Sequence, residues 1–271
     1  MGRWRTRQGA ALAAWLAVWT IALTAERDQP RARPGRPAPS APAERRVPFG
    51  PGEVLEYDVS WSSLMTAGTA TISVRAKRRS YDSVAYYIVA EGRPVSVLAS
   101  LYRLYYKADT LLDAYTLLPQ RGSLYSEEGR RRRMRETRFD QRGRSAVYEV
   151  SGEGAAPQRL ALRTGTHDPL SAIFALRALP LRRGLRVSMP VSDAGRLYQV
   201  EVAVTTRESL PTPLGPRTAW RLVPSVAGGG QPVDARELVI WISDDDRRLP
   251  LRMDAQMPVG AFRLMLREAR S

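Results

Sequence analysis

The sequence predicts an all-β fold, either a curved antiparallel sheet or an open β-barrel, with two short helices. Apolar and polar residues alternate with a period of two in several segments, as they do in strands with one buried face. No long helical pattern alternates with these segments, which argues against a parallel α/β sheet. The clearest alternating segments are Leu55–Trp61, Ala70–Ala76, Tyr198–Val204 and Phe262–Arg267.

Turn signals separate the alternating segments at intervals of roughly 10–15 residues, which suits consecutive antiparallel hairpins. They are Arg78–Ser80, Asp113–Ala114, Gln141–Gly143, Asp193–Gly195, Gly228–Gly230, Asp244–Asp246 and Met257–Pro258. The Gly228–Gly230 run lacks the Lys and Ser or Thr of a phosphate-binding loop, so we interpret it as a turn.

The first expected helix covers Val95–Tyr105. Its apolar face would carry Leu98, Leu101, Tyr102 and Tyr105. An amphipathic stripe is normally core, but these four residues could also line an apolar cavity. Both interpretations stay open from the sequence.

The second expected helix covers Asp168–Leu179. Asp168 is a good N-cap, and Pro169 suits the first helical position because its missing N–H has no partner there. Leu170, Phe174 and Arg177 would share one face.

The first 46 residues are predicted to lie outside the folded domain. Arg3 to Arg7 precede the uncharged stretch Ala10–Ala25, which is shorter than the roughly 20 residues of a membrane span but suits an export signal. We expect residues 1–25 to be a signal peptide or an uncleaved inner-membrane anchor. Residues 26–46 form a Pro- and Arg-rich linker, and residues 47–271 form the β-rich domain. The expected location is the periplasm.

Composition excludes several classes of site. The chain has no Cys and one His, so Cys-based zinc sites, thiol catalysis and multi-His metal sites are excluded. The net charge is +15, yet Lys77 and Lys107 are the only lysines. This skew towards Arg, with an export signal, argues against a nucleic-acid partner. The charge still suits anionic lipids or polyanions. We expect no cofactor and no metal.

Three motifs in order resemble the DUF3108 family of exported bacterial proteins. The first is Pro48–Glu53, followed by Tyr57, Trp61 and Ala67-Gly68. The second is Asp168–Ala172 with Arg177, and the third is Ile240–Asp245 with Arg248–Leu251. The resemblance spans about residues 47–268 and implies a periplasmic β-rich protein, without catalytic residues to carry over. A weaker architectural likeness is to the open β-barrels of lipoprotein carriers, which does not establish function.

The run Arg130–Arg135 is the strongest local anomaly. If it forms a strand, both faces of that strand are polar, which is typical of an edge strand protected by charge. The functional alternative is contact of Arg131, Arg133 and Arg135 with an anionic ligand or lipid headgroup.

Other polar residues offer weaker candidates. Asp244–Asp246 could be paired carboxylates or a cation site, but it lacks the alternating spacing of a calcium loop and fits a hairpin turn. His167 could be a general base, yet the chain has no Gly-x-Ser-x-Gly motif to supply a nucleophile, so it is expected to precede the cap of a helix.

The expected function is therefore a non-enzymatic cell-envelope role, binding a lipophilic or amphiphilic molecule or a partner protein. One alternative is an envelope enzyme that uses carboxylates such as Asp168 or Asp244–Asp246. Another is a membrane-tethered structural or interaction module. The sequence does not specify the oligomeric state.

Overall fold

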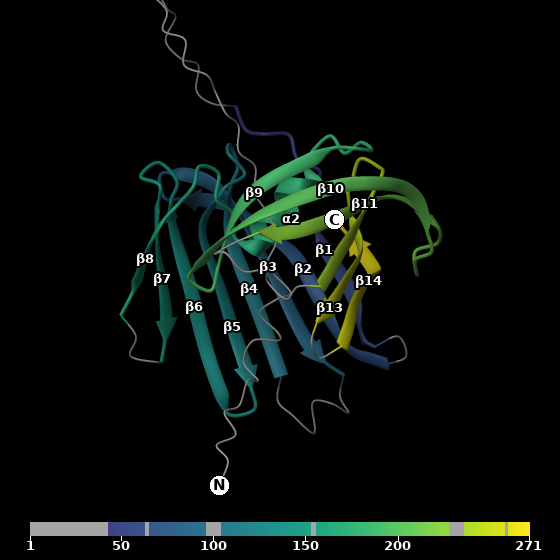
Figure 1. Cartoon of the computed structure of the whole chain (residues 1–271), viewed down its shortest axis with the longest axis horizontal. Coiled ribbons are helices and arrows are strands. Elements are labelled where there is room, and N and C mark those ends of the chain that lie inside the picture. Colours follow the sequence, from purple (N-terminus) through teal and green to yellow (C-terminus); the bar gives the residue numbers. More distant parts are fainter. Residues whose placement is uncertain (1–42, 63–64, 96–103, 153–155, 228–235, 258–259) are drawn as a thin grey trace, which may run out of the picture.

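The computed structural model describes residues 43–62, 65–95, 104–152, 156–227, 236–257 and 260–271 (Figure 1). In these residues the chain forms fourteen strands and one short helix, α2. The strands before α2 are β1 (Val54–Trp61), β2 (Met65–Ser80), β3 (Ser83–Pro94), β4 (Leu104–Asp113), β5 (Pro119–Glu128), β6 (Arg131–Asp140), β7 (Ser145–Ser151) and β8 (Gln158–Ala161). Then come α2 (Pro169–Arg177), β9 (Arg186–Asp193), β10 (Arg196–Leu210), β11 (Arg217–Ala227), β12 (Arg236–Ser243), β13 (Pro250–Met257) and β14 (Gly260–Arg270).

All strands belong to one antiparallel sheet in the order β8-β7-β6-β5-β4-β3-β2-β1-β14-β13-β12-β11-β10-β9. Each strand pairs with its neighbours in sequence, except that β8 and β9 do not pair with each other. In addition, β1 pairs with β14, which joins the first and last strands. Strands β8 and β9 are the edges, so the sheet is not closed. The predicted all-β class and curved antiparallel sheet are confirmed, and the four alternating segments fall in β1, β2, β10 and β14.

The sheet curves until its two edges meet at a seam, the contact between the β8 region and the β9–β10 hairpin. Gln158 Nε2 donates to the Gly195 carbonyl over 3.1 Å, and an Arg163 guanidinium nitrogen lies 2.7 Å from Gln199 Oε1. Just before α2, His167 forms an isolated parallel bridge with β9. Side chains and one bridge, rather than a continuous ladder, therefore join the edges.

Helix α2 confirms one of the two expected helices. Asp168 caps it, with its carboxylate accepting from the backbone N–H groups of Leu170 and Ser171. In the other expected helix, residues 96–103 lie outside the described part of the chain. Tyr105 belongs to β4, so the prediction was wrong there: the backbone pairs with both β3 and β5, and this pairing outweighs the amphipathic pattern.

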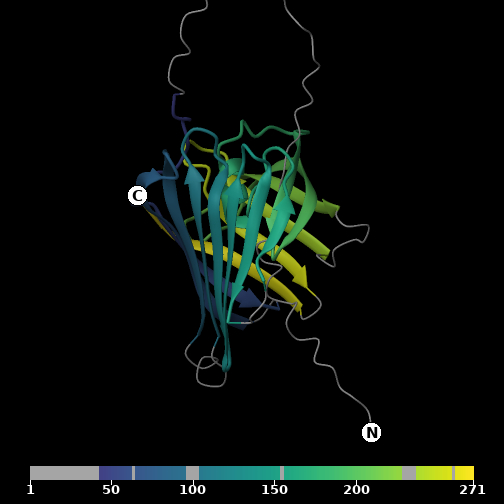
Figure 2. The same cartoon turned by 90° about the vertical axis from the view of Figure 1, so that its left-hand side faces the viewer.

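Helix α2 lies inside the curve of the sheet rather than on its outer surface (Figure 1). Nearly every residue of α2 is buried, including polar Ser171 and Arg177. Figure 2 shows β2–β8 side by side as one wall around this interior. One hydrophobic core joins Leu170 and Phe174 of the helix to inward-facing residues such as Tyr57 and Val202. The helix thus fills one half of the interior, which we call the plugged half.

Arg177 at the end of α2 anchors the plugged half. Its side chain is fully buried and forms two parallel bonds to Glu53, with N–O distances of 2.6 and 2.8 Å. It also donates to the carbonyls of Pro48, Arg247 and Arg248. These residues come from the three motifs noted in the sequence, so the motifs meet in one buried network. Removing one partner of such a network leaves an uncompensated buried charge.

The chain enters the domain at the end of the sheet where the β2–β3, β4–β5 and β6–β7 turns lie. Arg45 N–H donates to the Ala114 carbonyl over 3.1 Å, and Glu44 pairs with Lys77. The expected signal or anchor, residues 1–25, and most of the expected linker lie outside the described residues. Within the described residues, no helix is long and apolar enough to span a membrane.

Candidate functional site

The interior below α2 is lined by inward-facing residues that follow one register row. Tyr57 of β1 is in the core, and residues paired across antiparallel strands point to the same face. The row continues from Tyr57 through Ala70, Gly92, Tyr106 and Ser126 to Arg133. We call the five residues from Ala70 to Arg133 the open wall.

Small residues leave space along the open wall. Among the described residues, no heavy atom lies within 4 Å of the position that a Gly92 Cβ would take. The contrast is Gly122, which faces the plugged half. A Cβ there would lie 3.1 Å from Asp168 side-chain atoms. Among the described residues, the inner face is therefore tightly packed at Gly122 and has room for a side chain at Gly92.

An aromatic pair borders the row of the open wall at β1 and β14. Trp61 and Phe262 are paired in register and their rings stack with centroids 6.3 Å apart. Trp61 is 42% exposed, although Tyr57 on the same strand face is fully buried. Large apolar surface is thus available at this side of the interior.

The basic residues border the opposite side. Arg135 and Thr137 line an inner cavity, so Arg131 and Arg133 on alternate positions of β6 share that face. Arg132 faces outward, where it lies 3.4 Å from Glu127. The odd-numbered arginines singled out in the sequence are therefore brought together on the inner face.

The edge-strand interpretation of this run was wrong. Strand β6 is an interior strand, paired with both β5 and β7. The sheet tolerates the charge because acidic residues of β5 lie opposite it: Glu128 pairs in register with Arg131, and Glu127 with Arg132. Opposite charges at paired positions stabilise a sheet, whereas like charges destabilise it.

A small cavity lies where this basic side meets the seam. Its volume is about 50 Å³. Its polar lining comes from Asp109, Ser123, Arg135, Thr137, Tyr148, Asp168, Ser192 and Asp193. The Ser192 hydroxyl is buried and has no hydrogen-bond partner within the described part of the chain. A buried polar group without a partner is costly, which marks the cavity as a place for a polar ligand group or ordered water.

Three carboxyl groups line the cavity, and they differ in how many hydrogen bonds they already accept. Asp109 accepts from Arg121 and from the Ser123 hydroxyl. Burial raises the pKa of Asp168 to about 6, but both its oxygens are engaged: one accepts from Leu170 and Ser171 N–H, the other from the Thr110 hydroxyl over 2.6 Å. Burial also raises the pKa of Asp193 to about 6, while Arg135 opposes this rise. Asp168 is therefore a helix cap, and Asp193 is the group able to meet a ligand.

His167 is buried beside the cap, and burial lowers its pKa to about 3. Its Nδ1 lies 3.2 Å from the Ser171 hydroxyl, which also bonds to the Asp168 backbone. Ser171 is fully buried, so this contact supports the helix start and exposes no nucleophile. The predicted position before the helix cap is confirmed.

The Asp244–Asp246 segment forms the expected turn. Asp244 accepts from Arg207 over 2.6 Å and from Trp220 over 2.8 Å, and the Arg207 bond contributes most to lowering its pKa. Asp245 accepts from the backbone N–H groups of the residues that follow. In the described residues, no group of three acidic or His side chains is arranged to hold a metal ion.

Of the proposed cavity-lining residues, Leu98, Leu101 and Tyr102 lie outside the described part of the chain. Tyr105 lies on the outer face of β4, because its neighbour Tyr106 faces inward. Its ring centroid is 6.1 Å from that of Tyr125, so the structure does not place it in the cavity.

Sequence reasoning did not find Gly92, Ser192 or Asp193. The Gly in the middle of a strand pattern was an available signal, since it often marks close approach or open space. Asp193 stands out only as the first residue of a turn signal, and Ser192 carries no pattern of its own. Their role depends on the seam, which only long-range pairing creates.

Comparison with known proteins identifies the family. The model of DUF3108, described as proteins of unknown function, matches residues 56–267, and the chain belongs to this family. No curated protein matches the sequence.

Three solved structures are similar at low identity. A β-barrel-like DUF1849 protein from Brucella abortus is 12% identical with a TM-score of 0.49, and the match covers 80% of this chain and 96% of that one. A Bacteroides fragilis protein with a YmcC-like fold, provisionally named as exported, is 8% identical with a TM-score of 0.35, covering 84% and 100%. A protein of Parabacteroides distasonis, provisionally named a lipoprotein, is 7% identical with a TM-score of 0.35, covering 83% and 98%.

Proposed function

We propose that this DUF3108 protein is a non-enzymatic cell-envelope protein that binds an amphiphile with an acidic headgroup inside its curved sheet. The single observation that carries the proposal is the open wall. No heavy atom of the described residues lies within 4 Å of a Cβ built at Gly92, and the open wall lies between the exposed aromatic surface of Trp61 and the inward-facing arginines of β6. A core without a ligand role would be filled to close packing.

The distribution of charge determines the class of ligand. Arg133 and Arg135 point inward from β6, and guanidinium groups bind carboxylate and phosphate through paired hydrogen bonds. Five strand spacings separate Arg133 from Tyr57, which is on the order of 24 Å along the sheet. An amphiphile with an apolar tail and an acidic head matches this separation of apolar and basic surface.

The cavity at the seam supports the same assignment. Ser192 and Thr137 supply hydroxyls, and Asp193 supplies an acceptor, all beside Arg135. These groups would bind hydroxyl or amine substituents of a headgroup. The surroundings thus favour a head with both an acidic and a hydrogen-bonding part.

Competition for a bound fluorescent probe tests this proposal. The probe is anilinonaphthalene sulfonate, and the competitors are lysophosphatidylglycerol and lysophosphatidylcholine. We expect the acidic lipid to displace the probe at lower concentration. The variant Arg133→Ser/Arg135→Ser should lose at least tenfold in affinity for it, because two of the three inward-facing arginines of β6 are gone.

The matched control is Arg132→Ser/Arg138→Ser, which removes the same charge from the outer face of the same strand. It should bind like the wild type. Equal loss in both double variants would mean that net charge, and not the open wall, attracts the probe. Absence of binding by the wild type would contradict the proposal.

Export is the second part of the proposal. It is supported by the Arg3–Arg7 start and the uncharged Ala10–Ala25 stretch. A fusion of residues 1–50 to alkaline phosphatase should be active in bacteria, since that enzyme needs an oxidising compartment. An inactive fusion retained in the cytoplasm would contradict export.

An envelope enzyme is the second candidate, and one observation favours it. Asp168 and Asp193 line the same cavity, both with a pKa raised to about 6, which is the range of a general acid or base. Asp193 is the better candidate of the two, because within the described part of the chain it accepts from the Ala194 backbone N–H alone, whereas both oxygens of Asp168 are engaged. If hydrolysis of an ester-containing amphiphile is seen and Asp193→Asn abolishes it without loss of binding, the enzyme is favoured over the carrier.

A further inference from the structure

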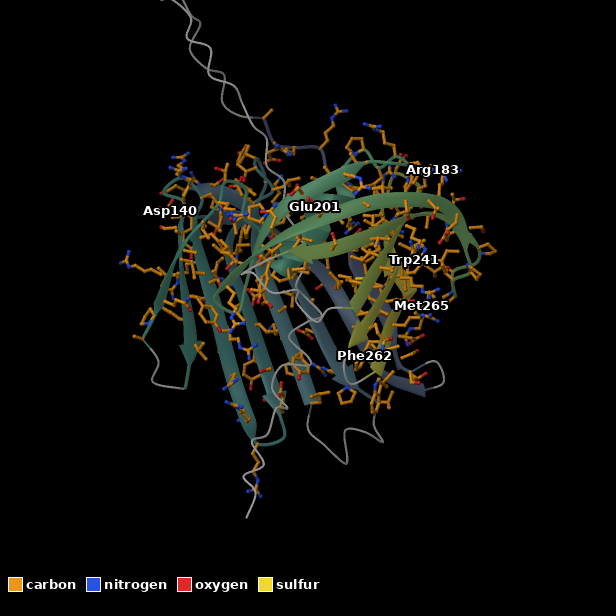
Figure 3. All side chains as sticks on the ribbon, viewed as in Figure 1. Asp140, Arg183, Glu201, Trp241, Phe262 and Met265 are labelled. Carbon is orange, nitrogen blue, oxygen red and sulfur yellow. The ribbon has the colours of Figure 1, made fainter. Side chains whose placement is uncertain are left out.

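The end of the sheet where the chain enters carries a concentration of exposed arginine. The meander places the β2–β3 and β6–β7 turns at this end. We call it the linker end and define it by the exposed residues Arg45, Arg46, Arg78, Arg79, Tyr81, Arg142 and Arg144. Figure 3 shows the exposed Arg183 in the upper part of the view, which is the side of the linker end.

Nearby acidic groups do not balance this charge, although exposed Asp82 in the β2–β3 turn offsets one of the six arginines. Glu44 is paired with Lys77. Asp140 accepts the Gly143 backbone N–H over 2.7 Å, which ties it to its own turn. Asp113 is turned inward as the cap of the β4–β5 turn and accepts from Ser83 and Thr116. The linker end therefore keeps a strong positive potential.

An exposed aromatic residue lies among these arginines. Tyr81 is 59% exposed at the tip of the β2–β3 hairpin, with a φ of 47°. Below it, the Arg78 guanidinium stacks 4.7 Å from the centre of the Tyr87 ring. Tyr with Arg is the composition of surfaces that contact the headgroup layer of a membrane, because both have an apolar body and a polar tip.

The chain that precedes the domain begins at the same end. The described residues start at Ala43, and 42 residues precede them, including the uncharged Ala10–Ala25 stretch. The point where those residues attach to the domain is therefore at the linker end.

We propose that the linker end docks against an anionic lipid bilayer. The potential attracts the acidic headgroups, Tyr81 enters the interfacial layer, and the preceding segment is delivered to the same surface. This inference goes beyond ligand binding and does not depend on it. It orients the molecule so that the β5–β6 turn, at the other end of β6, points away from the membrane.

The absence of Cys allows a site-specific test on the full chain. Arg142→Cys and Arg130→Cys place one thiol in exposed turns at opposite ends of β6, and each removes one arginine. Each is labelled with a polarity-sensitive dye and mixed with vesicles of phosphatidylglycerol or of phosphatidylcholine. We expect a blue shift at position 142 with phosphatidylglycerol only, fading as salt rises, and none at position 130.

A second variant measures the contribution of charge. Arg78→Ser/Arg79→Ser in the Arg142→Cys chain should raise the half-saturating concentration of phosphatidylglycerol at least tenfold, since each Arg near an anionic surface contributes roughly fivefold. An equal shift at both dye positions, or with both lipids, would overturn the proposal. A shift with soluble polyglutamate but not with vesicles would also overturn it, in favour of an acidic protein partner.

Discussion

The plugged half and the open wall are parts of one continuous sheet, but different side chains occupy their inner faces. In the plugged half, α2 brings Phe174 and Arg177 against the strands, and Arg177 is held by Glu53 and three backbone carbonyls. Along the open wall, the inward positions are Ala70, Gly92, Tyr106, Ser126 and Arg133, and no heavy atom of the described residues lies within 4 Å of a Cβ built at Gly92. The comparison teaches that strand pairing fixes the shell, whereas the choice of inward side chains decides which part is core and which part can bind.

The largest effect is expected from breaking the plugged half. Arg177→Met leaves Glu53 buried without its partner and should lower the free energy of unfolding by about 3–5 kcal/mol, measured by urea denaturation. The double variant Arg177→Met/Glu53→Leu should recover a large part of that loss. A loss below about 1 kcal/mol in the single variant would show that the network does not hold the helix.

The two inward glycines compare the halves directly. Gly122→Ala places a Cβ 3.1 Å from Asp168 atoms and should cost about 1–3 kcal/mol by overpacking. Gly92→Ala meets open space and should change stability by less, or raise it by about 0.5–1 kcal/mol, because Ala loses less backbone entropy. Equal destabilisation by both changes in thermal unfolding would erase the distinction between the halves.

Asp193 at the seam should make the free energy of unfolding depend on pH. Burial raises the pKa of Asp193 to about 6 from its ordinary value near 4, so the folded state binds more protons in this interval. Its contribution to stability therefore falls as pH rises from about 4 to 6. Asp193→Asn should remove about 1–2 kcal/mol of that fall, discounted for partial exposure.

Other groups do not obscure this comparison. Burial raises the pKa of Asp168 as it does that of Asp193, but Asp168 is present in both the wild type and the Asp193→Asn variant, so its contribution cancels. Burial lowers the pKa of His167 to about 3, so its contribution is lost as pH falls below about 6.5, the opposite direction. The difference between variant and wild type over pH 4–6 isolates Asp193, and identical pH profiles would contradict the burial of its carboxyl group.

The smallest effect on stability is expected at the aromatic side of the interior. Trp61 is 42% exposed and gains mainly from stacking on Phe262, so Trp61→Ala should cost about 1 kcal/mol or less. The same change should reduce probe binding several-fold, because it removes apolar contact surface. A cost of several kcal/mol in urea denaturation would place Trp61 in the core.

Much of the fold could be predicted from the sequence because strand alternation and helix capping are local. The period of two located β1, β2, β10 and β14, and Asp168-Pro169 located α2. The predicted helix through Tyr105 failed because an apolar stripe of aromatic residues also fits a strand, and pairing with β3 and β5 decided the outcome.

The candidate site could be predicted only in part. The alternation of Arg131, Arg133 and Arg135 predicts that they share one face of the strand. It does not predict whether that face is the inner or the outer one, because both faces of β6 are polar. An edge position was inferred from charge, whereas acidic residues of β5 supply the compensation. The cavity at Ser192 needs the seam between β8 and β9, which no local pattern encodes.

The most direct test of the open wall as a ligand site is native mass spectrometry of the protein purified from the envelope of its own cells. We expect a retained mass that matches an acidic amphiphile, present in the wild type and in Arg132→Ser/Arg138→Ser, and lost in Arg133→Ser/Arg135→Ser. A bare protein mass in all three, or equal retention by all three, would contradict the assignment of the open wall as the binding surface.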